Sequence, residues 1–249
     1  MSTFFIAAII IFCFTTVLTI AGVGAAFGII PFLFWLGFPL KEAMATALLL
    51  NSLSMSFASV TFIRNKLVSF QTALPILIVA SSISPIGAYC TQFVSREILL
   101  WLFSSFLVFA GSMMLFFRPR AKESLYNWKQ QLLIGVLIGA IAGYIGGLLG
   151  VGGGNLIVPA LIWIGFDPRK AAATSGFIVI FSSLSAFLGH VLLGNVNLPL
   201  LGISAFASIG GGLLGAWLLS FKLKGQQVKV VIGLVLYIVA LKMIWGLLS

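Results

Sequence analysis

The sequence predicts an all-α, polytopic integral membrane protein built from two repeats, and three observations carry this prediction. First, 61% of the 249 residues are hydrophobic and 7% are charged, whereas a soluble domain is roughly 45–50% apolar and about 25% charged. Second, the apolar residues form runs close to the length of about 20 residues that a spanning helix needs. Third, the basic residues behind the net charge of +10 lie in short loops between those runs. Such loops are typical of the cytoplasmic face of a membrane protein, and we expect no nucleic-acid partner.

The charges and turn residues divide the chain into eight long apolar runs and two short ones. The long runs cover residues 4–21, 43–63, 70–92, 98–117, 131–149, 171–192, 198–221 and 228–248. The short runs cover 25–38 and 153–166, and each follows a glycine-rich break. One polar stretch divides the chain near its middle. We therefore expect a transmembrane repeat at 1–120, a basic cytoplasmic linker at 121–130 and a second transmembrane repeat at 131–249.

An internal duplication relates the two repeats. A shift of 128 positions places residues 22–46 on residues 150–174 without a gap, and 12 of these 25 positions are identical. The identities include glycine, proline, tryptophan and threonine in register, which an apolar composition alone does not produce. Because self-similarity at a fixed spacing indicates a repeated architecture, each short run is expected to have the same role in its own half.

The basic residues favour an inverted relation between the halves. If the short runs do not cross the membrane, the chain has eight crossings and the fourteen basic residues divide seven to seven. If they do cross, each half has five segments, and the division is 11 to 3. The positive-inside rule favours the second arrangement, with both termini outside. Short runs of about 14 residues reach only about 21 Å, so we expect them to be broken or to lie among protein.

The glycine-rich breaks are the first candidate site. A break exposes backbone N–H groups at a new helix N-terminus, whose partial positive charge suits an anion. Short, glycine-broken segments at matching places in inverted repeats also indicate the binding site of a secondary transporter. The alternative is that these glycines only allow close helix packing. The substrate-binding glycines predicted here are Gly22, Gly24, Gly152, Gly153 and Gly154.

Polar residues inside the apolar runs form the second candidate set. Each costs free energy in a membrane unless it is hydrogen-bonded or faces water. On a helix, Asn51 and Ser54 share one stripe, and Ser175, Ser182 and Ser185 share another. The alternative for the hydroxyls is interhelical hydrogen bonding, worth about 0.6 kcal/mol on average. An amide can donate two hydrogen bonds to an oxyanion. The predicted set is Asn51, Ser54, Asn155, Thr174 and Ser175.

Catalytic and metal chemistry has few residues available. The chain has four acids, one histidine and two cysteines, and they are scattered along the sequence. We therefore expect no catalytic residue, no metal site and no cofactor, and we do not expect an enzyme. No acid lies inside an apolar run, so the sequence does not favour a cation permease. His190, near the end of its run, is expected at the membrane interface, with a proton relay as the alternative.

The repeated motif resembles a known family. The run GVGGG at 150–154, followed by Pro159, Gly165 and the run AAATS at 171–175, together with its fainter copy in the first half, resembles the TauE/SafE family of sulfite exporters and related anion permeases. The resemblance covers essentially the whole chain and implies transport of small sulfur oxyanions or organosulfonates. The first copy departs from the motif, with Phe27 in the place of Asn155. The two halves are therefore not expected to contact a substrate equally.

The sequence as a whole favours a multi-pass permease of the cell inner membrane that exports a sulfite-like anion by alternating access. Its expected partners are the small anion and the lipid bilayer, and a homo-oligomer is compatible with the sequence. The alternatives are a permease for another small solute and a membrane scaffold that transports nothing.

Overall fold

The computed structural model describes residues 2–116, 128–192 and 198–222, together with 230, 233, 234, 237, 238, 240, 241 and 243–246. The described chain is helical, and the predicted fold class, an all-α polytopic membrane protein, is confirmed. The helices are α1 (Ser2–Ile20), α2 (Ala26–Trp35), α3 (Leu40–Arg64), α4 (Phe70–Cys90), α5 (Arg96–Phe116), α6 (Trp128–Leu148), α7 (Gly154–Trp163), α8 (Pro168–Leu192) and α9 (Leu198–Phe221), with a 3₁₀ turn at Thr91–Phe93 after α4.

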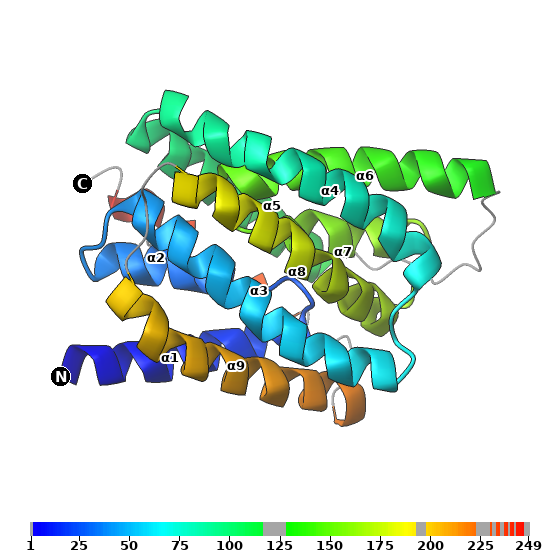
Figure 1. Cartoon of the computed structure of the whole chain (residues 1–249), viewed down its shortest axis with the longest axis horizontal. Coiled ribbons are helices and arrows are strands. Elements are labelled where there is room, and N and C mark those ends of the chain that lie inside the picture. The colour runs from blue at the N-terminus through cyan, green and yellow to red at the C-terminus, as the bar shows by residue number, and fades with distance from the viewer. Residues whose placement is uncertain are drawn as a thin grey trace.

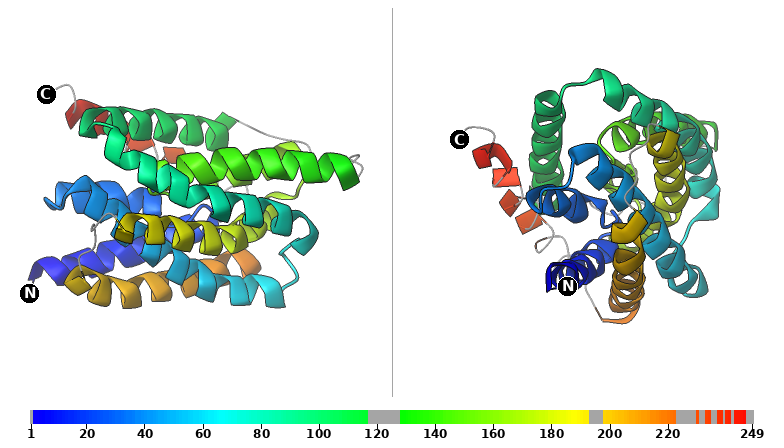
Figure 2. Two further views of the ribbon diagram at one scale, coloured as in Figure 1. Left: turned by 45° about the horizontal axis from the view of Figure 1, so that its top comes forward. Right: turned by 60° about the vertical axis from the view of Figure 1, so that its left-hand side comes forward.

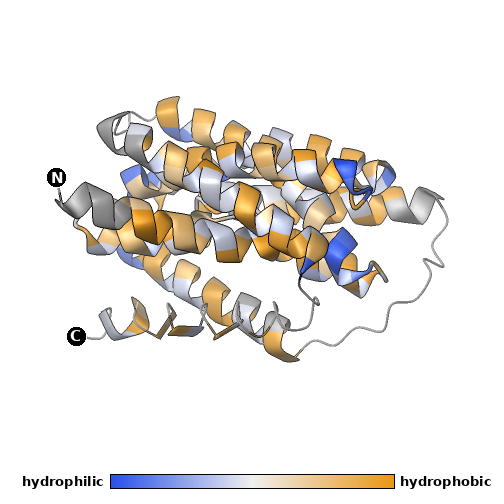
Figure 3. Cartoon of the chain, turned by 90° about the horizontal axis from the view of Figure 1, so that it is seen from below, coloured by the Kyte–Doolittle hydropathy of each residue, from blue (hydrophilic) through white to orange (hydrophobic). Residues whose placement is uncertain are grey.

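Four stretches of the described chain are long and apolar enough to cross a membrane. They are Leu40–Arg64, Phe70–Phe93, Pro168–Leu192 and Ser204–Phe221. Shorter apolar stretches lie in the other described helices. Hydrophobic residues predominate along most of the length of the helices, and the most hydrophilic residues lie toward the ends of the bundle (Figure 3). Many large hydrophobic side chains are exposed on the outside of the described chain. A bilayer requires this distribution, because its hydrocarbon core offers no hydrogen bonds to polar groups.

The two short runs of the sequence form two short helices with matching bounds. The bounds of α7 are those of α2 moved by 128 positions, and α8 stands in the same relation to α3. Each short helix has 10 residues, about 15 Å at 1.5 Å per residue. Neither reaches across a membrane alone, as the sequence predicts. Most of the predicted linker 121–130 and much of the predicted run 228–248 lie outside the described residues.

The helices pair across the halves. Helix α1 packs along α9, and α6 packs along α4 (Figures 1 and 2). Glycines make these contacts close: a Cβ at Gly143 would lie 2.6 Å from the carbonyl oxygen of Ala80, and one at Gly211 would lie 2.6 Å from that of Phe12. Small residues allow such close backbone approach between membrane helices. The first long helix of each half therefore packs on the fourth helix of the other half.

The contacts also show in which direction each helix runs. Gly139 meets Ile76 and Gly143 meets Ala80, so α6 runs parallel to α4. Helices α1, α3 and α9 run together in the opposite sense, from left to right in Figure 1. Since α1 and α3 both run the same way, the chain between them must return. The break after α1 and helix α2 make that return.

Helices α3 and α8 pack against each other at the centre of the bundle and run in opposite directions (Figure 1). Ser52 of α3 donates a hydrogen bond to the carbonyl oxygen of Ile180 of α8, with 2.9 Å between the oxygens. Both helices are largely buried, and both carry buried polar residues. The two central helices thus place polar side chains from both halves next to each other.

Charged residues anchor the end of the bundle at which α8 begins. Asp167 accepts hydrogen bonds from the backbone N–H groups of Arg169 and Lys170, at 2.9 and 3.3 Å. The guanidinium of Arg169 donates to the carbonyl oxygens of Leu219 and Ser220, at 2.9 and 2.5 Å. A cation at the last carbonyls of a helix stabilises its C-terminus. Arg169 thus joins the start of α8 to the end of α9.

Candidate functional site

Two glycine-rich breaks lie inside the bundle, one before α2 and one before α7. Gly22 and Gly24 in the first break have φ of 67° and 82°, and Gly152 and Gly153 in the second have φ of 74° and 78°. These are left-handed conformations that L side chains rarely adopt. Glycine lets the chain turn sharply here and start a new helix inside the bundle. All four glycines are buried.

Asn51 of α3 joins the first break to α8. Its Oδ1 accepts a hydrogen bond from the backbone N–H of Ala25 at 2.8 Å, and its Nδ2 donates to Oγ of Ser183 at 3.0 Å. The Asn51 side chain is fully buried. A buried amide with both ends satisfied fixes the position of its partners. Asn51 therefore holds the start of α2 and the middle of α8 in one arrangement.

Both breaks converge on Asn51. A Cβ at Gly24 would overlap the Asn51 amide, and a Cβ at Gly152 would overlap Ser183 Oγ and lie 3.1 Å from Asn51 Nδ2. Gly24 and Gly152 are thus required for two reasons: their φ angles are positive, and a side chain at either position would overlap its neighbours. The breaks, which are 128 positions apart in the sequence, meet on one side chain.

Hydroxyls of α8 hold the carbonyl groups of the second break. Ser182 donates to the carbonyl oxygen of Gly152 at 2.8 Å, and Ser175 donates to that of Gly154 at 3.3 Å. The carbonyls are occupied in this way, while the first N–H groups of α7 have no acceptor within their own helix. The start of α7 therefore carries the partial positive charge of a helix N-terminus.

Asn155 lies in the first turn of α7 and is 1% exposed. Neither its Oδ1 nor its Nδ2 has a hydrogen-bond partner within the described chain. An unsatisfied buried polar group costs about 1–3 kcal/mol, so its presence needs an explanation. At the matching place in the first half, Phe27 packs on Phe103 and Phe106 of α5, with ring centroids 5.9 and 5.5 Å away.

Three other predicted site residues lie in contacts between or within helices. Ser54 donates to the carbonyl oxygen of Asn51 at 3.0 Å. Thr174 Oγ1 accepts from the backbone N–H of Ser69, just before α4, at 3.1 Å. A Cβ at Gly22 would overlap the backbone of Ala172. The structure thus brings Gly24, Asn51 and the second break together, and it places these three outside that group.

Sequence reasoning missed Ser183 as a site residue. It follows Ser182 directly and so lies about 100° away around the helix from the predicted stripe of Ser175, Ser182 and Ser185. The stripe of Asn51 and Ser54 is likewise divided, because Ser54 bonds within its own helix. A search for polar partners facing Asn51 from the opposite half would have been the useful signal.

The acidic residues that the structure describes lie away from the centre of the bundle. The described acids are at helix starts: Glu42 in α3, Glu97 in α5 and Asp167 just before α8. Within the described ranges, no group of three histidine, cysteine or acidic residues could hold a metal ion. Amide, hydroxyl and backbone N–H groups surround the two breaks, and they suit a small polar solute or an anion better than a cation. The imidazole of His190 is fully buried in the last turn of α8.

Comparison with known proteins gives full-length and partial matches. The chain is 28% identical to the probable membrane transporter protein YunE of Bacillus subtilis, over 92% of this chain and 93% of that protein. It is 26% identical to the probable membrane transporter protein y4hK of Sinorhizobium fredii, over 93% and 95% of the two chains. It is also 36% identical to the sulfite exporter TauE/SafE family protein 1 of Arabidopsis thaliana, over 38% of this chain and 21% of that protein.

A family profile spans almost the whole chain. The family described as Sulfite exporter TauE/SafE matches residues 7–243, which include both breaks and all the central helices. The match covers both halves of the chain. The chain belongs to the TauE/SafE sulfite exporter family of membrane proteins.

Proposed function

We propose that this protein moves a small sulfur oxyanion or organosulfonate across the cell inner membrane, and that the anion binds at the start of α7. The observation that carries the proposal is the Asn155 amide, which is 1% exposed and unpartnered within the described chain, in the first turn of a helix that begins inside the bundle. An oxyanion there would accept hydrogen bonds from the amide and from the first N–H groups of α7. The family description and the names of relatives support the choice of a sulfur oxyanion.

Alternating access is the proposed mechanism. Inverted halves that meet at broken helices are typical of secondary transporters, in which one unit rocks against another around a fixed site. The opposite directions of α3 and α8 and the matched bounds of α2 and α7 support this interpretation. Asn51 and Ser183 make a hydrogen bond between the halves at that place. If the two halves rock against each other, the Asn51–Ser183 hydrogen bond between them either moves with them intact or breaks in one of the two states.

The positions of the charges support an orientation in the membrane. Arg64 at the end of α3, Arg169 and Lys170 at the start of α8 and Lys222 after α9 lie at the end of the bundle opposite Lys41. By the positive-inside rule, we place the end with the four basic residues in the cytoplasm. Both short helices then return the chain across part of the membrane.

Cysteine labelling tests this topology. We expect single cysteines at Lys66 and Lys170, in a Cys13→Ser/Cys90→Ser background, to be protected from a membrane-impermeant maleimide in intact cells. A cysteine at the exposed Gln92 should react. Both protected sites should react after the cells are made permeable. Eight crossings would instead place Lys66 and Lys170 on opposite sides, so that finding one of them reactive from outside contradicts the proposed topology.

The variant Asn155→Leu tests the anion site. We expect sulfite flux in proteoliposomes to fall at least tenfold, because the oxyanion loses its amide donors. The midpoint of thermal unfolding in detergent should stay the same or rise, since leucine removes an unsatisfied amide worth about 1–3 kcal/mol. Sulfite should also stabilise the wild type against heating and not the variant.

Thr15→Val is the matched control for that experiment. Thr15 of α1 also has a buried hydroxyl without a partner within the described chain, and it lies against α9. This variant should keep its flux. A scaffold that transports nothing would show no sulfite flux in any of these proteins. Wild-type flux in Asn155→Leu would refute the anion site, and so would a loss of flux that tracks a loss of stability.

A further inference from the structure

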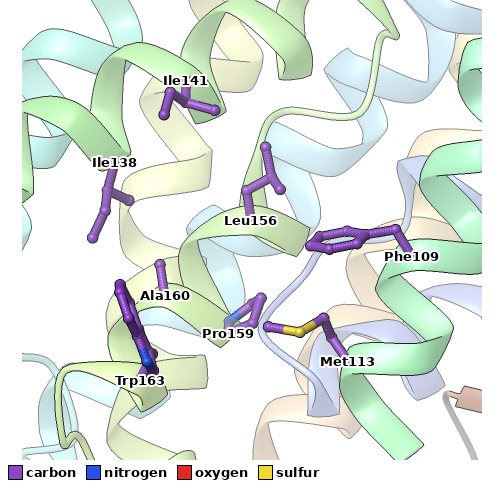
Figure 4. A pocket seen from close by; sticks show the side chains of 8 residues that line it. All are labelled: Phe109, Met113, Ile138, Ile141, Leu156, Pro159, Ala160 and Trp163. Atoms are coloured by element: carbon purple, nitrogen blue, oxygen red, sulfur yellow. The ribbon is translucent and has the colours of Figure 1, made fainter. Parts of the chain in front are cut away.

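An apolar cavity of about 220 Å³ lies between α5, α6 and α7 (Figure 4). Phe109 and Met113 enter it from α5, Ile138 from α6, and Leu156 and Pro159 from α7, and every side chain that lines it is apolar. An apolar cavity of about 150 Å³ in a protein stays dry and takes up small hydrocarbons. Water is therefore not the expected occupant of this cavity.

The cavity opens to the outside of the bundle. Trp163, Ile141 and Phe109 all line it, and they are 75%, 55% and 48% exposed. In a membrane protein, the space outside such apolar side chains is filled by lipid hydrocarbon. An acyl chain therefore has direct access from the bilayer, and it is the hydrocarbon present there at the highest concentration.

Trp163 marks the end of the cavity. It is the last residue of α7, which runs from the centre of the bundle toward the end that carries Arg169 and Lys170. Tryptophan prefers the interface between hydrocarbon and headgroups, where its ring is apolar and its N–H reaches a polar partner. The exposed indole is well placed to meet a headgroup while the chain below it enters the cavity.

The first half differs at the matching place. Gly28 stands where Leu156 stands in the second half, and the ring of Phe14 packs directly on it. The residue in the place of Phe14 is Ala142, which brings no ring. A bulky ring therefore occupies the contact between the first and short helices in one half and is missing from the other.

We propose that this cavity binds one acyl chain of a membrane phospholipid, with the headgroup at Trp163. The proposal is independent of the transport proposal, because it concerns the outer surface of α5, α6 and α7 and not the breaks. An acyl chain matches the cavity in its apolar chemistry and its route of entry. It would also hold α5 against α7, since few other contacts join these two helices.

Photo-crosslinking in lipid nanodiscs tests the proposal. The probe is a phosphatidylglycerol with a diazirine at the middle of one acyl chain, and the labelled residues are read by mass spectrometry. We expect Met113 and Leu156, which are only partly exposed, to be labelled at least threefold more than Ile78 of α4, which is 61% exposed. Lipid that merely surrounds the protein would label the more exposed Ile78 more strongly.

Variants in which a larger side chain fills the cavity provide the second part of the test. Ala160→Phe should lower the labelling of Met113 and Leu156 at least fivefold and leave that of Ile78 unchanged. Met113→Trp closes the cavity from α5 and replaces the first variant if that one does not fold, with the labelling of Leu156 alone as the readout. Ile78→Phe, an apolar change elsewhere on the surface, should leave the labelling of Leu156 unchanged.

Three outcomes would overturn the proposal. The first is labelling of Leu156 and Met113 at or below that of Ile78. The second is unchanged labelling of Leu156 in a folded variant with a filled cavity. The third is a bifunctional crosslink from Trp163 to a second copy of the chain under the same conditions, which would show that a protein surface and not a lipid covers the cavity.

Discussion

Gly152→Ala is expected to lower sulfite flux at least tenfold and to destabilise the protein by about 2–5 kcal/mol. A non-glycine residue at a φ of 74° costs about 1–2 kcal/mol. The added methyl group would overlap Ser183 Oγ, and overpacking of this kind costs roughly another 1–3 kcal/mol. Relief of the overlap would move α8 away from the second break. Flux in proteoliposomes and unfolding in detergent measure the two effects.

Gly37→Ala separates the two causes. Gly37 has a φ of 91°, but a Cβ there would meet nothing within 4 Å. This variant should bear only the backbone cost, about 1–2 kcal/mol, and keep its flux. Ser183→Ala removes the overlapping oxygen but also leaves Asn51 Nδ2 without its acceptor, so we expect the double variant Gly152→Ala/Ser183→Ala to lose less stability than the sum of the two single variants. If Gly152→Ala behaves like Gly37→Ala in both measurements, the convergence of the breaks is not what transport requires.

Asn51→Leu is expected to abolish flux and to cost about 2–6 kcal/mol of stability. Leucine has nearly the same size, but it leaves the N–H of Ala25 and the hydroxyl of Ser183 without their partner. Each orphaned buried group costs about 1–3 kcal/mol. The start of α2 would lose the contact that fixes it to α3. Detergent unfolding and sulfite flux again give the readout.

Asn65→Leu, just after the end of α3, is the matched control. Asn65 follows α3 and donates to the carbonyl oxygen of Thr61 at 2.8 Å, but it is exposed to solvent. Water can replace its bond, so we expect a change in stability within about 0.5 kcal/mol. A stable and active Asn51→Leu protein would mean that the amide bridge does not hold the breaks together.

The duplicated breaks could be predicted from the sequence for a physical reason. Gly24 and Gly152 hold positive φ angles in a crowded place, so no other residue fits, and the identity survives in both copies. Flanking Pro31 and Pro159 lie in α2 and α7 at matching positions. Because the backbone conformation at these positions requires glycine, the glycines can be recognised in the sequence. Their positions, together with the matching prolines, indicate where the short helices lie.

The partners of each helix could not be predicted in the same way. In a membrane the lipid is as apolar as the protein interior, so hydrophobic periodicity does not identify the packed face. The pairing of α4 with α6 depends on Gly139, Gly143 and Gly147, which look like any other glycines in the sequence. The bond from Asn51 to Ser183 joins residues 132 positions apart. Only the tertiary arrangement brings these two side chains together.

The pairing of α1 with α9 has a consequence for biosynthesis. Helix α1 ends at Ile20 and α9 at Phe221, so roughly 200 residues are made between them, which takes about 10–40 s at about 5–20 residues per second. During this time lipid or the insertion machinery must cover the face of α1 that carries Thr15 and Thr19 and that packs on Gly211 and Gly215 of α9 in the finished fold. Helix α1 therefore reaches its neighbour α9 only after the helices between them in the sequence have been made.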